Sequence, residues 1–122
     1  MAREIVLDTE TTGFDPKTGD RLIEVGCIEI EDLLPTGRTF HRLINPERLI
    51  PADAIRVHGI TDDKVKDAPK FAEIVTDLCD FIGDAPIIAH NAQFDRNFID
   101  HEFGRCGRAL FPEDRWIDTL KL

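Results

Sequence analysis

The spacing of apolar residues changes along the chain, and this change restricts the possible folds more than any other feature of the sequence. Residues 5–7, 22–30 and 39–44 carry short apolar runs or alternate apolar with polar side chains, as β-strands do. Residues 71–82 instead place apolar side chains at helical spacing. Strands followed by alternating helix and strand indicate an α/β sheet with helices packed on it.

The first three predicted strands are joined by short connections. Turn-forming residues occur at 15–20 and again at 34–37, so we expect an antiparallel three-stranded meander. In the second strand, Leu22, Ile28 and Ile30 alternate with glutamates, which predicts that these three apolar side chains face the core.

Helical and strand patterns alternate after the meander. We expect helices at residues 53–58, 71–82 and 92–103, a strand at 85–89, and a strand-like or helical element at 116–120. Proline just before the second helix and glycine just after it support its boundaries.

Length and composition suit one soluble domain, because the chain has 122 residues of which 42% are hydrophobic and 32% charged. No apolar run reaches the roughly 18–20 residues of a membrane span, and the N-terminus does not resemble a signal peptide. Cys27, Cys79 and Cys106 are far apart, so we expect reduced, mostly buried thiols in a cytoplasmic protein. The net charge of −9 argues against binding along a DNA duplex through a basic face.

The strongest chemical pattern is the segment DTETTG at residues 8–13, directly after the first apolar run. Alternate residues of a strand point to the same side, so Asp8 and Glu10 place two carboxylates on one face. Adjacent carboxylates repel each other unless a cation lies between them, and oxygen ligands suit Mg²⁺ or Mn²⁺. Such a pair also occurs as two solvated acids, but here the following threonines and glycine offer the N–H and hydroxyl groups that a phosphate site needs.

A second polar segment, HNAQFD at residues 90–95, follows the predicted strand at 85–89 and opens the next helix. Asp95 falls in the first turn of that helix, where the helix dipole favours a carboxylate. Taken separately, His90 is better explained by loop packing, and Asp95 by an ordinary helix start, than either is by catalysis.

Together the two segments resemble the first and second motifs of the DEDD superfamily of 3′–5′ exonucleases. Residues 57–61 (VHGIT) and 118–120 (DTL) resemble further elements of that family in the same order, so the resemblance covers essentially the whole chain. It is closest to the epsilon-type proofreading exonucleases of bacterial DNA polymerase III. The resemblance implies a ribonuclease-H-like α/β fold, with a mixed sheet that contains an antiparallel three-stranded meander and has helices on both sides.

The resemblance also implies a mechanism that uses two divalent cations, Mg²⁺ or Mn²⁺. Asp8 would bridge the two ions, Glu10 would ligate one of them, and Asp95 would hold a metal-bound water. The ions, roughly 4 Å apart, would activate the attacking water and stabilise the leaving 3′ oxygen. These three acids are the candidate catalytic residues.

Substrate contacts are implied at the same two segments and at the short helix between them. The candidate residues are Thr9, Thr11, Thr12, Val57, His58 and Phe94. The threonines would contact the terminal nucleotide, the other three would line the base pocket, and stacking there tolerates any base. Asn91 is expected to order its loop. The implied partners are a single-stranded or frayed DNA 3′ end and a DNA polymerase catalytic subunit, with no membrane.

The family also has a third motif, a His followed five residues later by an Asp, and the sequence ends at Leu122 before such a segment. We therefore interpret residues 1–122 as the N-terminal part of an exonuclease domain. This part is either a piece of a longer enzyme or a short relative that lacks catalysis. We expect residues 1–122 alone to hydrolyse little, because the loss of a general base costs about 10²–10⁴-fold in rate.

Two other functions remain compatible with these motifs. One is an RNA-directed exonuclease of the same fold, because the acids do not distinguish DNA from RNA. The other is a non-catalytic module that docks on a polymerase or helicase. The acid excess excludes neither an exonuclease site nor these alternatives, since metal ions and base stacking can hold a 3′ end without a basic groove.

Overall fold

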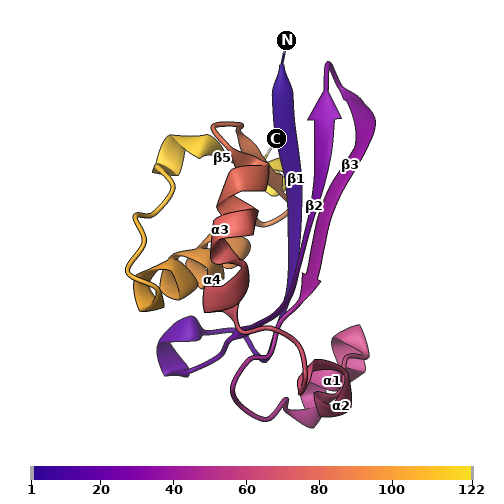
Figure 1. The fold of residues 1–122 in the computed structure, drawn as a ribbon, viewed down its shortest axis with the longest axis vertical. Helices are drawn as coiled ribbons and strands as arrows, with labels where there is room; N and C mark the ends of the chain where they lie inside the picture. The colour runs from indigo at the N-terminus through magenta and orange to yellow at the C-terminus, as the bar shows by residue number, and fades with distance from the viewer. Residues whose placement is uncertain (1, 122) are drawn as a thin grey trace.

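The computed structural model describes residues 2–121, and its centre is a five-stranded sheet with the order β3-β2-β1-β4-β5 (Figure 1). β1 (Arg3–Thr11), β2 (Leu22–Glu31) and β3 (Leu34–Leu43) pair antiparallel. β4 (Ile87–Ala89) pairs parallel with β1, and β5 (Trp116–Asp118) pairs parallel with β4. The predicted meander and mixed sheet are confirmed.

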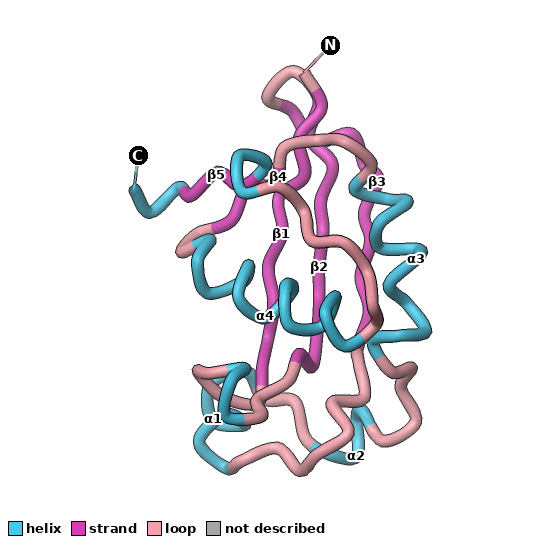
Figure 2. Tube along the Cα trace, turned by 90° about the vertical axis from the view of Figure 1, so that its left-hand side faces the viewer, coloured by secondary structure: helices cyan, strands magenta, loops and turns pink. Residues whose placement is uncertain are grey.

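Two long helices cover one face of this sheet. α3 (Phe71–Ile82) and α4 (Ala92–Arg105) pack on the same side, with α4 crossing β1 and β2 (Figure 2). The shorter helices α1 (Ala52–His58) and α2 (Asp62–Val65) lie at the end of the sheet where β1 ends. On the opposite face, α1 and α2 pack against Ile23 and Leu43 at one end, and no long helix covers the rest of that face within the described residues.

Short 3-10 turns complete the described chain. They are η1 (Pro16–Thr18), η2 (Glu113–Arg115) and η3 (Thr119–Lys121). The segment predicted at residues 116–120 is thus a strand that passes directly into a helical turn, so both of the features expected there are present. None of the helices in residues 2–121 has the length and apolar character that crossing a bilayer requires.

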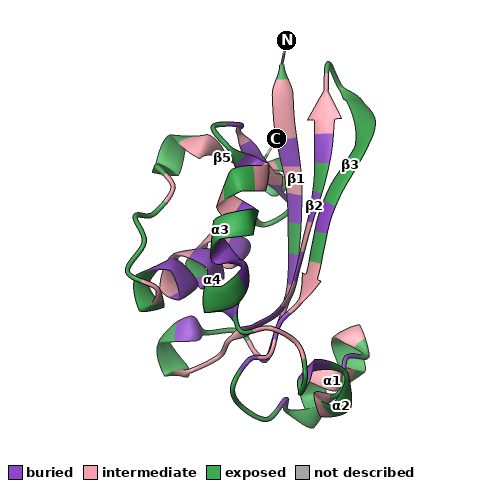
Figure 3. Ribbon diagram, in the orientation of Figure 1, coloured by how far each residue is buried: buried purple, intermediate pink, exposed green. Residues whose placement is uncertain are grey.

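The main core lies between the sheet and the two long helices. Ile5 and Leu7 of β1 point into it at 0% and 2% exposure, and Leu78 of α3 and Phe103 of α4 meet them from the other side at 0%. Figure 3 shows the buried segments concentrated in β1, β2 and α4. Side chains alternate along a strand. Because Ile5 and Leu7 face the core, Asp8 and Glu10 lie on the opposite face of β1.

The predicted facing of β2 is confirmed for Leu22 and is wrong for the residues after it. Val25 and Cys27 are the residues that enter the core, whereas Ile28 is 46% exposed on the other face. The cause is a register irregularity next to Thr11, which leaves Leu22 and Ile23 both fully buried, in two different clusters. An extra residue in one strand reverses the inward and outward positions that follow it.

Glu29 consequently faces inward at 4% exposure, although it was expected to point to solvent. Its carboxylate accepts hydrogen bonds from Arg3 Nε at 2.6 Å, Arg38 Nη1 at 2.8 Å and Thr36 Oγ1 at 2.7 Å. The Thr36 hydroxyl and the Arg3 guanidinium lower the pKa of Glu29 despite the opposing effect of burial. Buried charge is tolerated when it is paired and hydrogen-bonded in this way.

The turn between β2 and β3 lies at Asp32 and Leu33, not at residues 34–37 as predicted. Both residues have positive φ, 51° and 70°, as in a two-residue type I′ hairpin turn. The Asp32 N–H donates to the Ala2 carbonyl at 3.0 Å, and the Asp32 carboxylate accepts from Ala2 N at 3.2 Å. Residues 34–37 belong to β3, so the strand is five residues longer at its start than expected.

Replacing Leu33 by Gly is expected to raise the free energy of unfolding by about 0.5–1 kcal/mol. Left-handed backbone costs a non-glycine residue about 1–2 kcal/mol, which exceeds the added entropy of glycine in the unfolded chain. The substitution removes little buried apolar surface, because Leu33 is 84% exposed. Urea unfolding measures the change, and Leu34→Gly in the adjoining strand is the control that should destabilise. A lower midpoint for Leu33→Gly would contradict this account of the turn.

A second, smaller apolar cluster holds the α1–α2 segment to the end of the sheet. It consists of Ile23, Ile50, Ile60 and Val65, all below 8% exposure. Helix α2 has only four residues and was not predicted, since one turn shows no periodicity. The cluster matters for function because it fixes the position of α1.

The three cysteines are free, but only Cys27 is buried, whereas Cys79 and Cys106 are partly exposed. Burial raises the pKa of the Cys27 thiol to about 12. This thiol therefore stays protonated at neutral pH and serves as core packing.

Candidate active site

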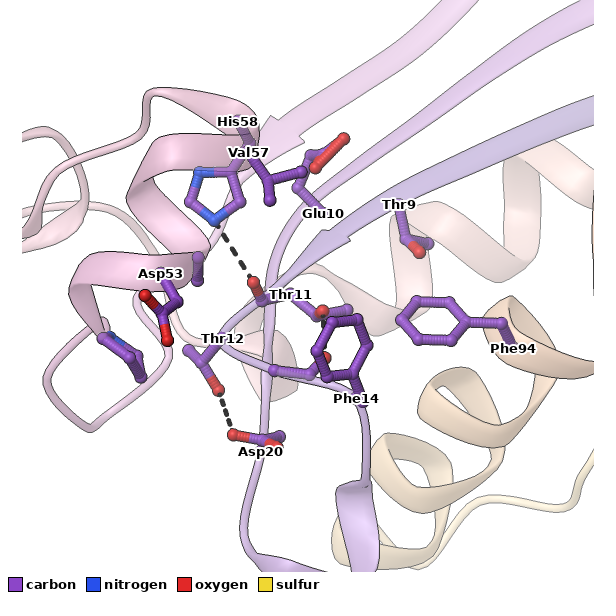
Figure 4. A pocket seen from close by; sticks show the side chains of 13 residues that line it. Thr9, Glu10, Thr11, Thr12, Phe14, Asp20, Asp53, Val57, His58 and Phe94 are labelled. Carbon is purple, nitrogen blue, oxygen red and sulfur yellow. Dashed lines mark hydrogen bonds between the residues drawn. The ribbon is translucent and has the colours of Figure 1, made fainter.

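A pocket of about 380 Å³ lies beyond the end of β1, between the loop that follows it, helix α1 and the start of α4 (Figure 4). Its lining residues are Thr9, Glu10, Thr11, Thr12, Gly13, Phe14, Asp20, Pro51, Asp53, Ala54, Val57, His58 and Phe94. All six predicted substrate-contacting residues are in this set, together with the predicted catalytic Glu10. Segments more than eighty residues apart in the sequence thus meet around one cavity.

The other two predicted catalytic acids lie beside the pocket. Asp8 is exposed on the same face of β1 as Glu10, and its carboxylate accepts the Thr9 N–H at 3.0 Å. Asp95 approaches from α4 and is 5% exposed. The Thr9 hydroxyl donates a hydrogen bond to Asp95 Oδ1, which fixes the start of α4 against β1.

This arrangement is possible because the edge of β1 is open at this point. β4 pairs with β1 only at Ile5 and Val6, so the part of β1 that carries Asp8 and Glu10 has no strand on that side. The first turn of α4 occupies the space instead. The end of a strand next to the start of a helix is where polar groups from both elements can meet without disturbing the core.

The three acids influence one another electrostatically. The pKa of Asp95 is raised to about 6, chiefly by burial and also by the charges of Asp8 and Glu10, while the hydrogen bond from Thr9 opposes the rise. The pKa of Glu10 is raised by burial and by Asp8, and His58 opposes the rise. No Lys or Arg lines the pocket to compensate these carboxylates.

Uncompensated carboxylates of this kind suit a divalent cation by charge and by ligand chemistry. Within residues 2–121, however, no three Asp, Glu, His or Cys side chains are grouped closely enough to hold a metal ion. Asp8, Glu10 and Asp95 are therefore neighbours with a suitable donor set, but they do not converge on a complete site by themselves.

His58 joins α1 to the end of β1. Its Nδ1 accepts the Ile60 N–H at 3.0 Å, so Nε2 carries the proton in the neutral ring and donates to the Thr11 carbonyl at 3.2 Å. Both ring nitrogens are engaged in this way. His58 is thus a wall of the pocket and a link between two elements, as its predicted place in the pocket implies.

The second motif is ordered from β5. Asn91 has a left-handed backbone with φ 65°, and its N–H donates to Asp118 Oδ1 at 2.9 Å. Asp118 Oδ1 also accepts the Leu120 N–H at 3.0 Å. Burial raises the pKa of Asp118, but backbone N–H donors at Leu120, Ala92 and Asn91 lower it by more, so the pKa is lowered overall. The DTL segment therefore positions the loop that begins α4, and Asn91 takes the strained conformation there.

Several lining residues were not predicted from the sequence. Phe14 is 88% exposed at the mouth of the pocket, and Asp20 and Asp53 add two further acids to its wall. A phenylalanine directly after the TTG segment is the one sequence feature that could have indicated Phe14. Asp20 lies in a polar turn, and Asp53 lies at the start of a short helix, where acids are common for structural reasons alone.

A mixed sheet with two acids on its central strand and a third acid at an adjoining helix start is the architecture of ribonuclease-H-like nucleases, and comparison with known proteins agrees. The sequence model described as Exonuclease, RNase T, matches residues 5–122. The chain therefore belongs to the exonuclease family. It is 50% identical over 121 residues to the protein named DNA polymerase III subunit epsilon of Rickettsia felis, across 97% of this chain and 53% of that protein. The chain thus spans about half the length of this relative.

Solved structures show the same fold. A product-bound exonuclease I superposes with a TM-score of 0.86 at 18% identity, over 99% of this chain and 30% of that one. A zinc-bound form of the Escherichia coli ExoI–ssDNA complex gives 0.83 at 18%, over 97% and 28%. Exonuclease X in complex with 5′ overhanging duplex DNA gives 0.69 at 27%, over 99% and 61%. The predicted family and fold are confirmed.

Proposed function

We propose that this chain provides the nucleotide pocket and the acidic residues of a metal-dependent 3′–5′ exonuclease that proofreads DNA. The observation that carries the proposal is the pocket beyond β1, which seven predicted site residues line, with Asp8 and Asp95 beside it. A cavity at the end of a strand, closed on one side by a helix start, admits the end of a chain rather than the middle of a duplex.

Asp8 and Glu10 are the proposed ligands of divalent cations, Mg²⁺ or Mn²⁺. When bound, such ions supply a polarised water and stabilise charge on the leaving oxygen. Asp95, held by the Thr9 hydroxyl, orients water at this site through its carboxylate. With a pKa of about 6, Asp95 is mostly ionised at neutral pH and can accept hydrogen bonds from that water.

The rest of the pocket suits a terminal nucleotide of any sequence. Val57, Phe94 and Phe14 offer apolar surface on which a base can stack, and the hydroxyls of Thr11 and Thr12 lie at the same end of β1. Stacking supplies binding without reading the base. A proofreading enzyme requires this property, since any nucleotide can be misplaced.

Two comparisons favour DNA as the substrate and a polymerase as the partner. The Exonuclease X structure, 27% identical to this chain, holds a duplex DNA with a 5′ overhang. The relative from Rickettsia felis is named as a subunit of DNA polymerase III. We propose that a frayed or single-stranded DNA 3′ end enters the pocket and that the complete protein assembles with a polymerase catalytic subunit.

The test is a nuclease assay on the complete gene product that contains residues 1–122, with 5′-labelled single-stranded DNA and an RNA of the same sequence. Stepwise shortening from the 3′ end of the DNA is expected with Mg²⁺ or Mn²⁺, and none with EDTA.

The alternatives predict different results in the same assay. Faster shortening of RNA than of DNA would replace the proposal with an RNA-directed exonuclease. Binding of DNA without shortening, by a protein that folds and binds Mn²⁺, would favour a non-catalytic module. Metal-independent cleavage would contradict the roles given to Asp8 and Glu10.

A further inference from the structure

The pocket has two walls that come from separate segments of the chain. One wall is the last residue of β1 with the loop that follows it, residues 11–14, and the other is helix α1. The two walls are not neighbours in a sheet or a helix, so no backbone ladder fixes the distance between them. Side-chain contacts therefore determine the width of the pocket: the smaller apolar cluster holds α1 to the end of the sheet, and polar contacts join α1 to the loop.

Asp20 organises the first wall. Its carboxylate accepts hydrogen bonds from the Thr12 hydroxyl at 3.0 Å and from the Asp15 N–H at 3.2 Å, and the Thr12 contact is visible in Figure 4. The Thr12 hydroxyl in turn accepts the Arg21 N–H at 3.0 Å. Asp20 thereby holds the loop in the folded-back shape that lines the cavity.

Arg48 joins this loop to the second wall. Its Nη1 donates to Asp20 Oδ1 at 3.1 Å and to the Gly19 carbonyl at 2.8 Å. Arg48 lies in the segment that leads into α1, whose far end is tied to the first wall by His58 and the Thr11 carbonyl. Helix α1 is thus attached to the first wall through the segment before it and through its last residue.

Gly13 shows how closely Asp20 lies under the loop. A Cβ atom added at Gly13 would stand 2.3 Å from Asp20 Oδ2, a distance that no packed structure accepts. Glycine at this position is explained by the carboxylate that occupies the space of a side chain, because the backbone there has no positive φ. The loop and the Asp20 carboxylate therefore pack directly against each other.

Resting on the exonuclease function proposed above, we propose that Asp20 and Arg48 are positioning residues that fix the width of the pocket for the terminal nucleotide. Their charged hydrogen bonds clamp the loop after β1 to the segment that leads into α1. The clamp acts on substrate binding rather than on the chemical step, since Asp8 and Glu10 lie on β1, which the sheet holds independently of the loop.

The test is steady-state kinetics of the complete protein on a single-stranded DNA with a 3′ hydroxyl, using Asp20→Ala, Arg48→Ala and the double variant. Each single variant should raise KM about tenfold, the scale of one lost charge-assisted hydrogen bond, with kcat changed less than about threefold. The double variant should raise KM by less than the product of the two single effects, because the two residues share the Asp20–Arg48 contact. Gly13→Ala should give the same KM effect by displacing the carboxylate.

Controls separate positioning from general loss of stability. Lys66→Ala removes another cation that is paired with an acid, Asp63 at 3.9 Å on α2, and should leave KM and kcat unchanged. Arg48→Lys retains the charge and should recover part of the wild-type KM. Thermal unfolding confirms that each variant is folded at the assay temperature.

The outcomes distinguish the clamp from the function on which it rests. If the wild-type protein releases no nucleotide, the proposed function fails and the positioning role falls with it. If the wild-type protein cleaves and the variants keep its KM, or if the two single effects add in the double variant, the clamp alone is overturned.

Discussion

Replacement of Glu102 by Ala should lower the free energy of unfolding by about 3–5 kcal/mol, as expected when one partner of a buried ion pair is removed. Glu102 lies on α4 at 2% exposure. Arg21 donates to its two carboxylate oxygens from Nε and Nη2, each at 2.8 Å, and the Leu22 N–H adds a longer contact of 3.4 Å. The hydrogen bond to Glu102 raises the pKa of Arg21, so the cation persists at any working pH.

The loss is large because the alanine variant leaves a guanidinium that is only 15% exposed with one remaining carboxylate, that of the more exposed Glu47 at 3.5 Å. Urea or thermal unfolding of residues 1–122 measures it. Glu113→Ala is the matched control, since Glu113 is 84% exposed and lies 3.5 Å from Arg96, and exposed pairs contribute about 0–1 kcal/mol. The double variant Arg21→Met with Glu102→Leu should recover much of the loss. A Glu102→Ala variant within about 1 kcal/mol of wild type would rule out this role for the pair.

The long helices were the most predictable part of the fold, because α3 repeats one apolar face over three turns between a proline and a glycine. α3 has the predicted bounds of 71 and 82. α4 was also predicted, but its buried side includes Asp95 and Glu102. Hydrophobic periodicity alone assigns such residues to solvent, and only their partners, Thr9 on β1 and Arg21 just before β2, explain their burial.

The strand errors have local causes that a pattern of single residues does not reveal. The irregularity near Leu22 changes the phase of β2, so the side chains after it face opposite to the predicted directions. The turn at Asp32 and Leu33 uses two non-glycine residues with positive φ, whereas Gly37 offered the stronger turn pattern nearby. Pairing with β1 and β3 decides both features, and it is not local information.

The candidate site likewise has residues that the sequence predicts and residues that it does not. The acids and threonines of the first motif were predictable because they are contiguous, and the resemblance to a family placed Asp95 beside them. The clamp residues Asp20 and Arg48 were not, since they are 28 residues apart in the sequence and lie in ordinary polar loops. Contacts between loops of this kind follow from the tertiary fold and leave no periodic trace in the sequence.

Asp95→Asn should have effects of opposite sign on stability and on activity. In the metal-free protein at pH 7, we expect the free energy of unfolding to rise by about 1–3 kcal/mol. The pKa of Asp95 is raised from 3.8 to about 6, chiefly by burial, so the ionised carboxylate is a cost to the folded state. Asparagine carries no charge, and its Oδ1 can still accept the Thr9 hydroxyl. Activity should fall about 10–100-fold, the scale for groups that support a metal site from outside.

The pH dependence of the free energy of unfolding tests the sign of this predicted stability change. An acid with a raised pKa binds its proton more tightly in the folded state, so the wild-type domain should lose stability as pH rises from about 4 to 6. The difference between Asp95→Asn and wild type should therefore shrink towards zero at pH 4. Asp77→Asn, at an exposed position on α3, is the control for the loss of one carboxylate outside the pocket.

Divalent cations should reverse the order of stability. Mn²⁺ stabilises whichever state binds it, so wild type should gain in thermal unfolding temperature on addition of Mn²⁺, and Asp95→Asn should gain less. A carboxylate of a functional metal site is expected to destabilise the metal-free fold and to stabilise it once a cation binds. A carboxylate in a structural ion pair would stabilise the fold without a cation. An Asp95→Asn variant that is less stable than wild type at pH 7, or equally stabilised by Mn²⁺, would show that Asp95 is part of the scaffold rather than of the site.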